Sequence, residues 1–523
     1  MLNASLRSVC GAVALALAAA LAAAGPAEAA PNPPAQRLSW ADCPPDPSSA
    51  PVDPRLRCAT LRVPLDYRAP SGKTIEIVVS RLNTAKPGLR RGVLVHNGGG
   101  PGVASLHIPS SRVNDYPQDV LDRYDLVSFD PRGVGYSTPV TCGRTAAQNP
   151  NELVFPFPGP DGSIAPNVRF AREVARDCLA NGGELIRHLN TANTARDLDR
   201  IRAALGEPRI SYLSASYGTY LGAVYAELFP GRTDRVVLDA NVSPNVTWQE
   251  RFALLDQASE ARFGDFAAWA AARDADLHLG ATPAAVRRNY LALAEKLDRT
   301  PVTHPVAGPV NGGLWRAIYR FDAYHAAFFQ EIADWWIYLA ADGNAPVPYW
   351  WLNRTTPGIP ADNDVAALFA VVCNDSPAPR STARYQRNVT ASRAAYPILD
   401  GLGANIWPCA FWTEPLEPQV RITDRGPANV LLLQTARDAV TPYEGALAMR
   451  STLGRRARMV TVDGGNHGAY DPGTPSCAVT AANRFLADGV LPARDRFCAV
   501  DPVAAPAGAA APRFARPGVQ ALA

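Results

Sequence analysis

Short runs of apolar residues recur along the first half of the chain. They have the length of strands and hold apolar side chains at consecutive positions, which is typical of strands buried on both faces. The runs are residues 58–63, 75–79, 92–96, 124–129, 210–213 and 235–238. Between them, 170–180 and 194–205 show a helical period, with Leu198, Ile201 and Leu205 on one face. This alternation predicts an α/β fold with a mostly parallel central sheet.

The pattern changes at residue 242, where the chain becomes helical and rich in aromatic residues up to residue 418. Strand-like runs resume only at 430–433 and 459–462. Because these two strands have no other sheet to join, we expect an α-helical cap inserted between strands 6 and 7 of a single sheet. It would lie at the carboxyl edge of the strands, and most of its aromatic side chains would form its own core.

The N-terminus has the features of a secretory signal. Arg7 precedes a short apolar run at 13–24, and Ala27-Glu28-Ala29 offers a cleavage site of the small-x-small type. No later run is long and apolar enough to span a bilayer, so we expect a secreted, extracellular protein without membrane insertion. The expected segments are a signal peptide at 1–29, core at 30–241, helical cap at 242–418, core at 419–500 and a disordered Ala/Pro-rich tail at 501–523.

Nine cysteines are present, and Cys10 falls within the expected signal. An even number in an exported chain argues for disulfides. The spacing favours sequential neighbours, although eight cysteines permit 105 pairings. The favoured pairs are Cys43 with Cys58, Cys142 with Cys178, Cys373 with Cys409, and Cys477 with Cys498.

Charge and motif content exclude several classes of function. The formal net charge is only +3 over 523 residues, and no basic cluster is interleaved with aromatic residues, so nucleic acid is not the expected partner. The chain has no Cys-x-x-Cys pair and no His-Glu-x-x-His run, so we expect no metal and no cofactor.

Ser216 stands where a strand pattern turns into a helical one. Such a nucleophile elbow projects the serine hydroxyl from the top of a sheet, and it needs small residues two before and two after the serine because strand and helix pack tightly there. Here these residues are Ser214 and Gly218. The usual motif has glycine at both positions, so Ser214 is a departure.

A serine needs a base, and the base needs an acid that fixes its tautomer. In this type of fold the chain order is Ser, Asp or Glu, then His. Of the seven histidines, only His467 follows the last strand, in a glycine-rich loop. Asp438 follows the preceding strand and is the favoured acid on loop context. Asp239, after an earlier strand, is its rival, and Asp463 is expected to be structural.

Acyl transfer also requires donors for the developing oxyanion. The backbone N–H of Tyr217, next to the nucleophile, is one candidate. The other is expected in the loop Asn-Gly-Gly-Gly-Pro-Gly at 97–102, from Gly99 or Gly100, because Pro101 has no N–H. No Gly-Lys-Ser/Thr follows this glycine loop, which argues against a phosphate-binding role.

Together these motifs resemble the secreted tripeptidyl aminopeptidases of actinobacteria, which belong with the prolyl aminopeptidase-like α/β-hydrolases. The motifs are the loop at 97–102, Asp-Pro-Arg-Gly-Val-Gly-Tyr-Ser at 130–137, the Ser216 elbow, Asp-Ala-Val-Thr-Pro at 438–442 and Asn-His-Gly at 466–468. The likeness runs from about Cys43 to Cys498, and the C-terminal segment looks like the family's end domain. The family usually has Gly where Ser214 stands and Pro where Gly98 stands.

The resemblance implies cleavage of peptides near a free N-terminus. Acidic residues of the cap would bind the α-ammonium group, and Asp375 in Cys-Asn-Asp at 373–375 matches a candidate segment; the alternative is that Asp375 caps a local turn. Asp130 and Arg132 are expected to form an ion pair or to support their turn.

Three functions are therefore considered. The first is a secreted serine exopeptidase. The second is a secreted carboxylesterase with the same triad, because fold and triad do not fix the acyl substrate. The third is a catalytically silent binding protein, against which the intact triad argues.

Overall fold

The computed structural model describes residues 36–46, 51–348, 356–471 and 476–499. The chain divides into Met1–Gln36 and Arg37–Ala523, and the fold below is that of the second unit. The expected signal peptide at 1–29 and tail at 501–523 lie outside the described residues. None of the helices in the described part of the chain has the length and apolar character that crossing a membrane requires.

One ten-stranded sheet forms the centre of this unit, in the order β1-β2-β3-β5-β4-β6-β7-β10-β11-β12. The pairs β1–β2, β2–β3 and β3–β5 are antiparallel. All other neighbouring strands of this sheet, from β5–β4 to β11–β12, are parallel. The strands are β1 Ala41–Asp42, β2 Arg57–Pro64, β3 Thr74–Leu82, β4 Gly92–His96, β5 Tyr124–Phe129, β6 Ile210–Ala215, β7 Thr233–Asp239, β10 Val430–Thr435, β11 Ala457–Val462 and β12 Arg496–Cys498.

The central strands are buried on both faces, as their continuous apolar runs predict. Alternate residues point to opposite sides of a strand. In β10, Val430 and Leu432 belong to one hydrophobic cluster, whereas Leu431 and Leu433 belong to another. The first cluster contains residues of α6 and α7, and the second contains residues of α3 and α17. The sheet is therefore covered by helices on both sides.

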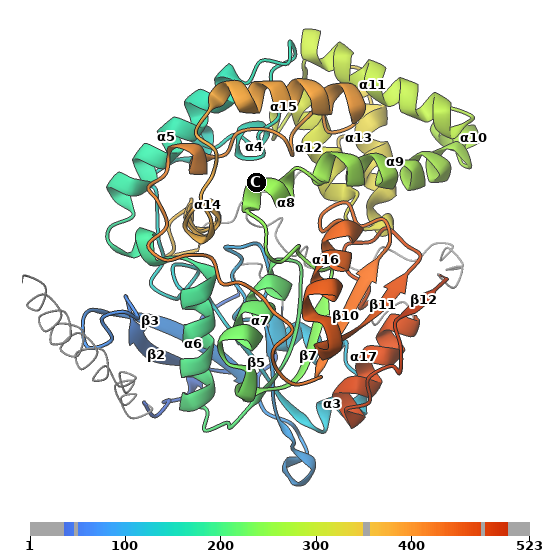
Figure 1. The fold of residues 1–523 in the computed structure, drawn as a ribbon. Helices are drawn as coiled ribbons and strands as arrows, with labels where there is room; N and C mark the ends of the chain where they lie inside the picture. Colours follow the sequence, from blue (N-terminus) through green and yellow to red (C-terminus); the bar gives the residue numbers. More distant parts are fainter. Residues whose placement is uncertain (1–35, 47–50, 349–355, 472–475, 500–523) are drawn as a thin grey trace, which may run out of the picture. The chain divides into compact units, whose positions relative to one another are not determined.

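The helices that accompany the sheet alternate with its strands (Figure 1). They are α2 Ile108–Arg112, α3 Gln118–Leu121, α4 Asn151–Val154, α5 Ala165–Asn181, α6 Thr191–Ala204, α7 Tyr217–Leu228, α16 Tyr443–Leu453 and α17 Cys477–Asp488. Short 3-10 helices are η1 Pro87–Leu89, η2 Ala146–Gln148, η3 Leu185–His188, η4 Pro230–Arg232 and η7 Gly454–Arg456. This arrangement is the α/β-hydrolase fold that the sequence predicts.

The segment between β7 and β10 is mainly helical, as expected. It holds α8 Trp248–Phe252, α9 Leu255–Ala271, α10 Asp274–Leu277, α11 Pro283–Arg299, α12 Gly312–Asp322, α13 Phe329–Ala340, α14 Asn363–Asp375 and α15 Thr382–Ala395, with η5 Ala326–Phe328 and η6 Pro408–Phe411. One detail corrects the sequence analysis: β8 Val302–His304 and β9 Gly308–Val310 form a small antiparallel hairpin within this segment. Helices α4 and α5, from before β6, pack against α12 and η6 (Figure 1).

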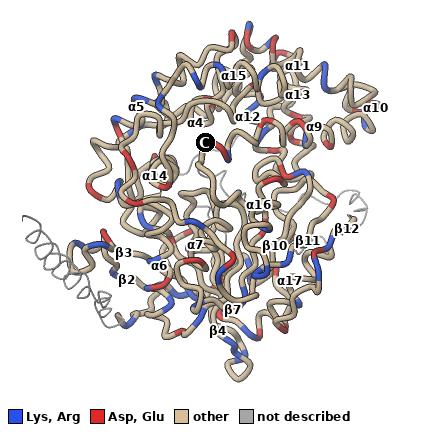
Figure 2. Tube along the Cα trace, in the orientation of Figure 1, with Lys and Arg blue, Asp and Glu red and all other residues tan. Residues whose placement is uncertain are grey.

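Four disulfides connect the cysteines in the predicted sequential pairs: Cys43–Cys58, Cys142–Cys178, Cys373–Cys409 and Cys477–Cys498. Residues of opposite charge are interspersed along the described chain (Figure 2).

Candidate active site

Ser216 lies between β6 and α7 in a strained conformation. Its φ of 59° and ψ of −133° lie outside the regions that residues with a Cβ usually adopt. Its N–H donates to the Asp239 carbonyl at 3.0 Å, which fixes the turn to the neighbouring strand. A Cβ at Gly218 would lie 1.8 Å from Ser214 Oγ, so this position requires glycine. The predicted elbow is confirmed as a local structure.

Both departures from the family pattern make hydrogen bonds that the usual residues could not make. Ser214 Oγ donates to the Asn97 carbonyl at 2.6 Å, which ties the elbow to the glycine loop. The Gly98 N–H donates to Ser105 Oγ at 2.8 Å, and proline has no N–H to donate. The two departures therefore stabilise the loop on either side of Asn97.

Asp438 and His467 are in direct contact, as predicted from their places in the chain. His467 Nδ1 lies 3.1 and 2.9 Å from the two carboxylate oxygens of Asp438, whose side chain is fully buried. Asp438 also accepts the N–H groups of Val440 at 2.8 Å and Thr441 at 2.9 Å, and Thr441 Oγ1 at 3.0 Å. These donors hold the carboxylate in one orientation at the Nδ1 edge of the imidazole ring.

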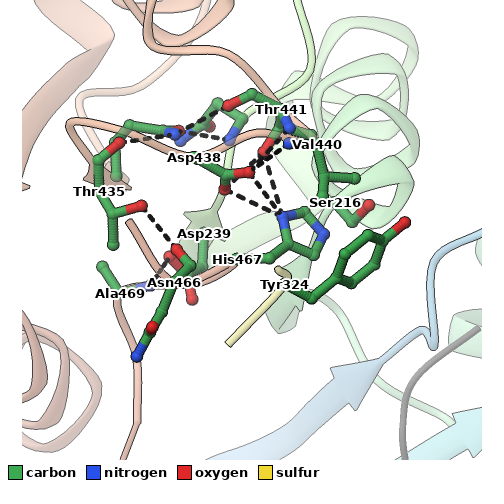
Figure 3. A network of polar contacts seen from close by, with 12 residues as sticks. Ser216, Asp239, Tyr324, Thr435, Asp438, Val440, Thr441, Asn466, His467 and Ala469 are labelled. Carbon is green, nitrogen blue, oxygen red and sulfur yellow. Dashed lines mark hydrogen bonds and ion pairs between the residues drawn. The ribbon is translucent and has the colours of Figure 1, made fainter. Parts of the chain in front are cut away.

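Figure 3 shows Ser216 on the side of the imidazole ring away from Asp438. Ser216 Oγ and His467 Nε2 make no hydrogen bond in this structure. Such contacts are often long without substrate and tighten in the substrate complex. The arrangement thus has the order serine, histidine, aspartate that proton transfer requires.

The rival acid, Asp239, has a different environment. It is buried at the end of β7 and accepts the N–H groups of Ala469 at 2.8 Å and Tyr470 at 3.0 Å. Burial raises the pKa of the Asp239 carboxyl to about 6, against the lowering effect of these two donors. Asp239 therefore holds the loop that follows His467, whereas Asp438 contacts the imidazole ring itself.

The glycine loop lies against the elbow. A Cβ at Gly99 would lie 3.5 Å from Ser216 Cβ. The Gly99 N–H, however, donates to Asn97 Oδ1 at 3.0 Å. Neither the Gly100 N–H nor the Tyr217 N–H donates a hydrogen bond to any described residue, and Tyr217 is the first residue of α7, where N–H groups have no partner in the helix. Of the two glycines left open by the sequence, Gly100 is therefore the one whose N–H is not accepted by a described residue.

Asp375 is buried rather than open to a ligand. One carboxylate oxygen accepts the Thr191 N–H at 2.7 Å, and the other accepts Thr191 Oγ1 at 2.7 Å and Trp248 Nε1 at 3.1 Å. Burial raises the pKa of this carboxyl, although the donors from Thr191 and Trp248 favour its charged form. Asp375 therefore caps the first turn of α6, a helix distant from it in the sequence. In this arrangement it neither presents an exposed carboxylate to an ammonium group nor caps the turn in which it lies.

The Asp-Pro-Arg-Gly turn contains no internal ion pair. Arg132 pairs with Asp197 at 2.7 Å, with both side chains fully buried. Asp130 accepts the N–H groups of Ser105 at 2.7 Å and Tyr136 at 2.9 Å, which is the expected turn support. Asp463 pairs with Arg437, in line with a structural role. Among the described residues, no cluster of His, Cys, Asp or Glu side chains is placed to hold a metal ion.

The segment after α12 contacts the histidine loop, and no motif in the sequence predicts this contact. The His467 N–H donates to the Tyr324 carbonyl at 2.6 Å, and the two rings lie 5.3 Å apart, edge to face. Asn466 Oδ1 accepts the Ala326 N–H at 2.9 Å. The sequence predicts that most aromatic residues of this stretch form the core of the cap, because their spacing does not mark Tyr324 as a residue that contacts the histidine.

Comparison with known proteins agrees with these motifs. A family model described as TAP-like protein matches residues 400–498. A tripeptidyl aminopeptidase of Streptomyces lividans is 36% identical over 482 residues, 88% of this chain and 86% of that protein. The serine protease Hip1 of Mycobacterium tuberculosis is 28% identical over 483 residues, covering 88% and 91%. Carboxylesterase B of M. tuberculosis is 31% identical over 463 residues, covering 85% and 86%.

Proposed function

The chain belongs to the tripeptidyl aminopeptidase family of serine hydrolases, and on that premise we propose that it is a secreted exopeptidase. It hydrolyses peptide bonds near a free N-terminus through an acyl-enzyme on Ser216. The observation that carries this proposal is the contact between His467 Nδ1 and the buried Asp438 carboxylate, beside a serine on a strained turn.

The proposed reaction has two halves, the formation of an acyl-enzyme and its hydrolysis. Ser216 Oγ attacks the scissile carbonyl, while His467 Nε2 accepts the hydroxyl proton and then delivers it to the leaving amine. Asp438 keeps the Nδ1 proton on its own side of the ring and stabilises the imidazolium that forms. Water then attacks the acyl carbon, with His467 Nε2 again as the base. The ester bond to Ser216 Oγ breaks, His467 returns the proton to that oxygen, and the acyl group leaves as a carboxylic acid.

The developing oxyanion needs fixed donors on the other side of the carbonyl. We assign these to the N–H groups of Tyr217 and Gly100. The assignment of Gly100 rests on the bond between the Gly99 N–H and Asn97, which leaves Gly99 without a donor for substrate.

Two properties of the chain support secretion. The first residues have the features of a signal peptide. The four disulfides are the kind of crosslink that persists in oxidising compartments. The test is the mass of the protein recovered from culture medium, where cleavage after residue 29 is expected and retention of residues 1–29 would contradict it.

The decisive experiment for the chemistry is Ser216→Ala. We expect this variant to lose both labelling by a fluorophosphonate probe and hydrolysis of free tripeptide amides. Wild-type protein titrated with the same probe gives the fraction of active enzyme. Turnover that persists in the variant would overturn the assignment of the nucleophile.

Similarity to a protein named Carboxylesterase B keeps a second candidate function open. An aminopeptidase should cleave tripeptide amides with a free amine and lose this activity when the amine is acetylated. An esterase should instead hydrolyse short acyl esters and show no dependence on an amine. Parallel assays of free and acetylated substrates therefore separate the two functions at the same serine.

A further inference from the structure

Arg320, on the last turn of α12, rests on a set of aromatic rings. Its guanidinium carbon lies 4.5 Å from the ring centroid of Phe155, 5.1 Å from that of Phe321 and 5.8 Å from that of Tyr324. One nitrogen donates to the Tyr324 hydroxyl at 3.4 Å. These contacts fix the half-buried side chain in place before any ligand arrives.

Arg320 forms no ion pair with any residue that the structure describes. Arginines on the neighbouring helices differ in this respect, since Arg262 pairs with Asp265 and Arg287 with Glu260. A guanidinium has five N–H donors, and the one bond to Tyr324 uses a single donor. The faces of the rings attract the cation but accept no strong hydrogen bond. The group thus retains donors in the fork geometry that matches a carboxylate.

Tyr324 connects this cation to the reacting groups. Its carbonyl holds the His467 N–H, and its ring lies 5.3 Å from the imidazole ring. In Figure 3, the hydroxyl end of this ring is directed away from His467. Arg320 contacts that hydroxyl end, so the Tyr324 ring lies between the guanidinium group and the imidazole ring. An extended peptide advances about 3.3–3.6 Å per residue, so such a separation corresponds to a few residues of substrate.

We propose that Arg320 is a specificity-determining residue that binds a carboxylate of the substrate peptide close to the scissile bond. The carboxylate belongs either to an acidic side chain or to the peptide's C-terminus. The proposal rests on the proposed peptidase function and adds a substrate class to it. The aromatic surroundings strengthen such a contact because they exclude water from one side of the pair.

The test compares peptides of the same sequence that differ only in charge. Each has a free N-terminus, and the pairs are Glu against Gln at successive positions and a C-terminal acid against its amide. For wild-type protein, we expect kcat/KM to be about tenfold or more higher for at least one acid than for its neutral partner. The pair that shows the preference identifies the source of the carboxylate.

The variant Arg320→Met removes the charge while its unbranched side chain still covers the rings. We expect it to abolish the preference for the acid and to change kcat/KM for the neutral partner less than about twofold, and Arg320→Lys to retain part of the preference because it keeps the charge without the fork. The matched control is Arg273→Met. Arg273 also stacks on an aromatic ring, Trp269, at 4.7 Å, but has no contact with Tyr324.

Two results would overturn the proposal: no acid preferred by the wild-type protein at any position, or an equal loss on acid and neutral substrates in Arg320→Met. Failure of the peptidase function gives a different result, namely hydrolysis of esters but of no peptide. In that case the same variants are compared on two aryl esters of a dicarboxylic acid, one with the second carboxyl group free and one with it methylated. Loss of the preference for the free acid in Arg320→Met then supports the proposal, and an unchanged preference overturns it.

Discussion

Substitution of Asp239 by Asn distinguishes an acid that positions a loop from one that acts on the base. Asp239 accepts the Ala469 and Tyr470 N–H groups, whereas Asp438 contacts His467 Nδ1. We therefore expect kcat of Asp239→Asn to stay within about tenfold of wild type. Asp438→Asn should lose about 10⁴-fold, the size of loss seen when the aspartate of other triads is replaced.

The effect of Asp239 on stability can be worked out from its pKa. Burial raises the pKa of this carboxyl from 3.8 to about 6. Because the folded-state value is the higher one, the contribution to stability is fully present below the unfolded pKa and is lost as the pH rises through about 6. A shift of roughly 2 units corresponds to about 3 kcal/mol, of which about 2 kcal/mol is lost between pH 4.5 and 7.5.

Asparagine does not titrate, so Asp239→Asn should lack this pH-dependent part. The assay is denaturant unfolding of both proteins at several pH values between 4.5 and 7.5, followed as the difference in free energy of unfolding. Asp256→Asn is the matched control: burial raises the pKa of Asp256 to about 6 as well, but its partners are Ser392 and Gly403. Its free energy of unfolding should differ from that of wild type with the same dependence on pH, while its kcat and KM stay unchanged.

Two outcomes would refute this reasoning. A loss of kcat in Asp239→Asn as large as that in Asp438→Asn would make Asp239 part of the triad. A free-energy difference from wild type that is independent of pH would show that burial does not raise the pKa of Asp239.

Three further predictions concern the packing around the site. Gly218→Ala should lower the free energy of unfolding by about 1–3 kcal/mol and also lower kcat, because its Cβ would lie 1.8 Å from Ser214 Oγ. Adding Ser214→Gly should restore stability in thermal unfolding and kcat in peptide hydrolysis, and additive effects of the two substitutions would contradict this. Asn466→Ala removes the bond to the cap and should lower kcat with KM unchanged in steady-state peptide assays, so a change in KM alone would count against it. Replacing both Cys373 and Cys409 by Ser opens a loop of 36 residues and should reduce the free energy of unfolding by about 4 kcal/mol in a denaturant titration, with kcat retained; an unchanged midpoint would refute it.

The sheet was largely predictable because burial on both faces leaves a mark in the sequence. The runs at 92–96 and 430–433 coincide with β4 and the start of β10. The strand β12 could not be predicted in this way, since Phe497 at its centre is 64% exposed. Its pairing partner, β11, and the Cys477–Cys498 disulfide define it instead. The same holds for the three-residue strands β8 and β9, which are too short to show a period.

The site was predictable to the extent that it depends on chain order. Ser216, Asp438 and His467 each follow a parallel strand, and the carboxyl ends of such strands meet at one edge of the sheet. Side-chain orientation is not encoded in that order. The donors to Asp375 come from two other helices, and the partner of the Gly99 N–H is a side chain two residues away. Only coordinates distinguish a carboxylate that receives such donors from one that awaits a ligand.

The contacts at Tyr324 also show how specificity can vary while the chemistry stays the same. The cap binds the backbone of His467 through the Tyr324 carbonyl, which a residue of any type supplies. The ring at 324 and the guanidinium at 320 are therefore not needed to place the base. Substitutions of these two side chains should change which peptides bind, whereas a change in the path of the backbone there would also displace the histidine. Two contacts hold this backbone in place: the buried Arg262 donates to the Ala323 carbonyl at 2.9 Å, and Asn466 accepts the Ala326 N–H. The side chains of the segment can thus vary as long as its backbone is preserved.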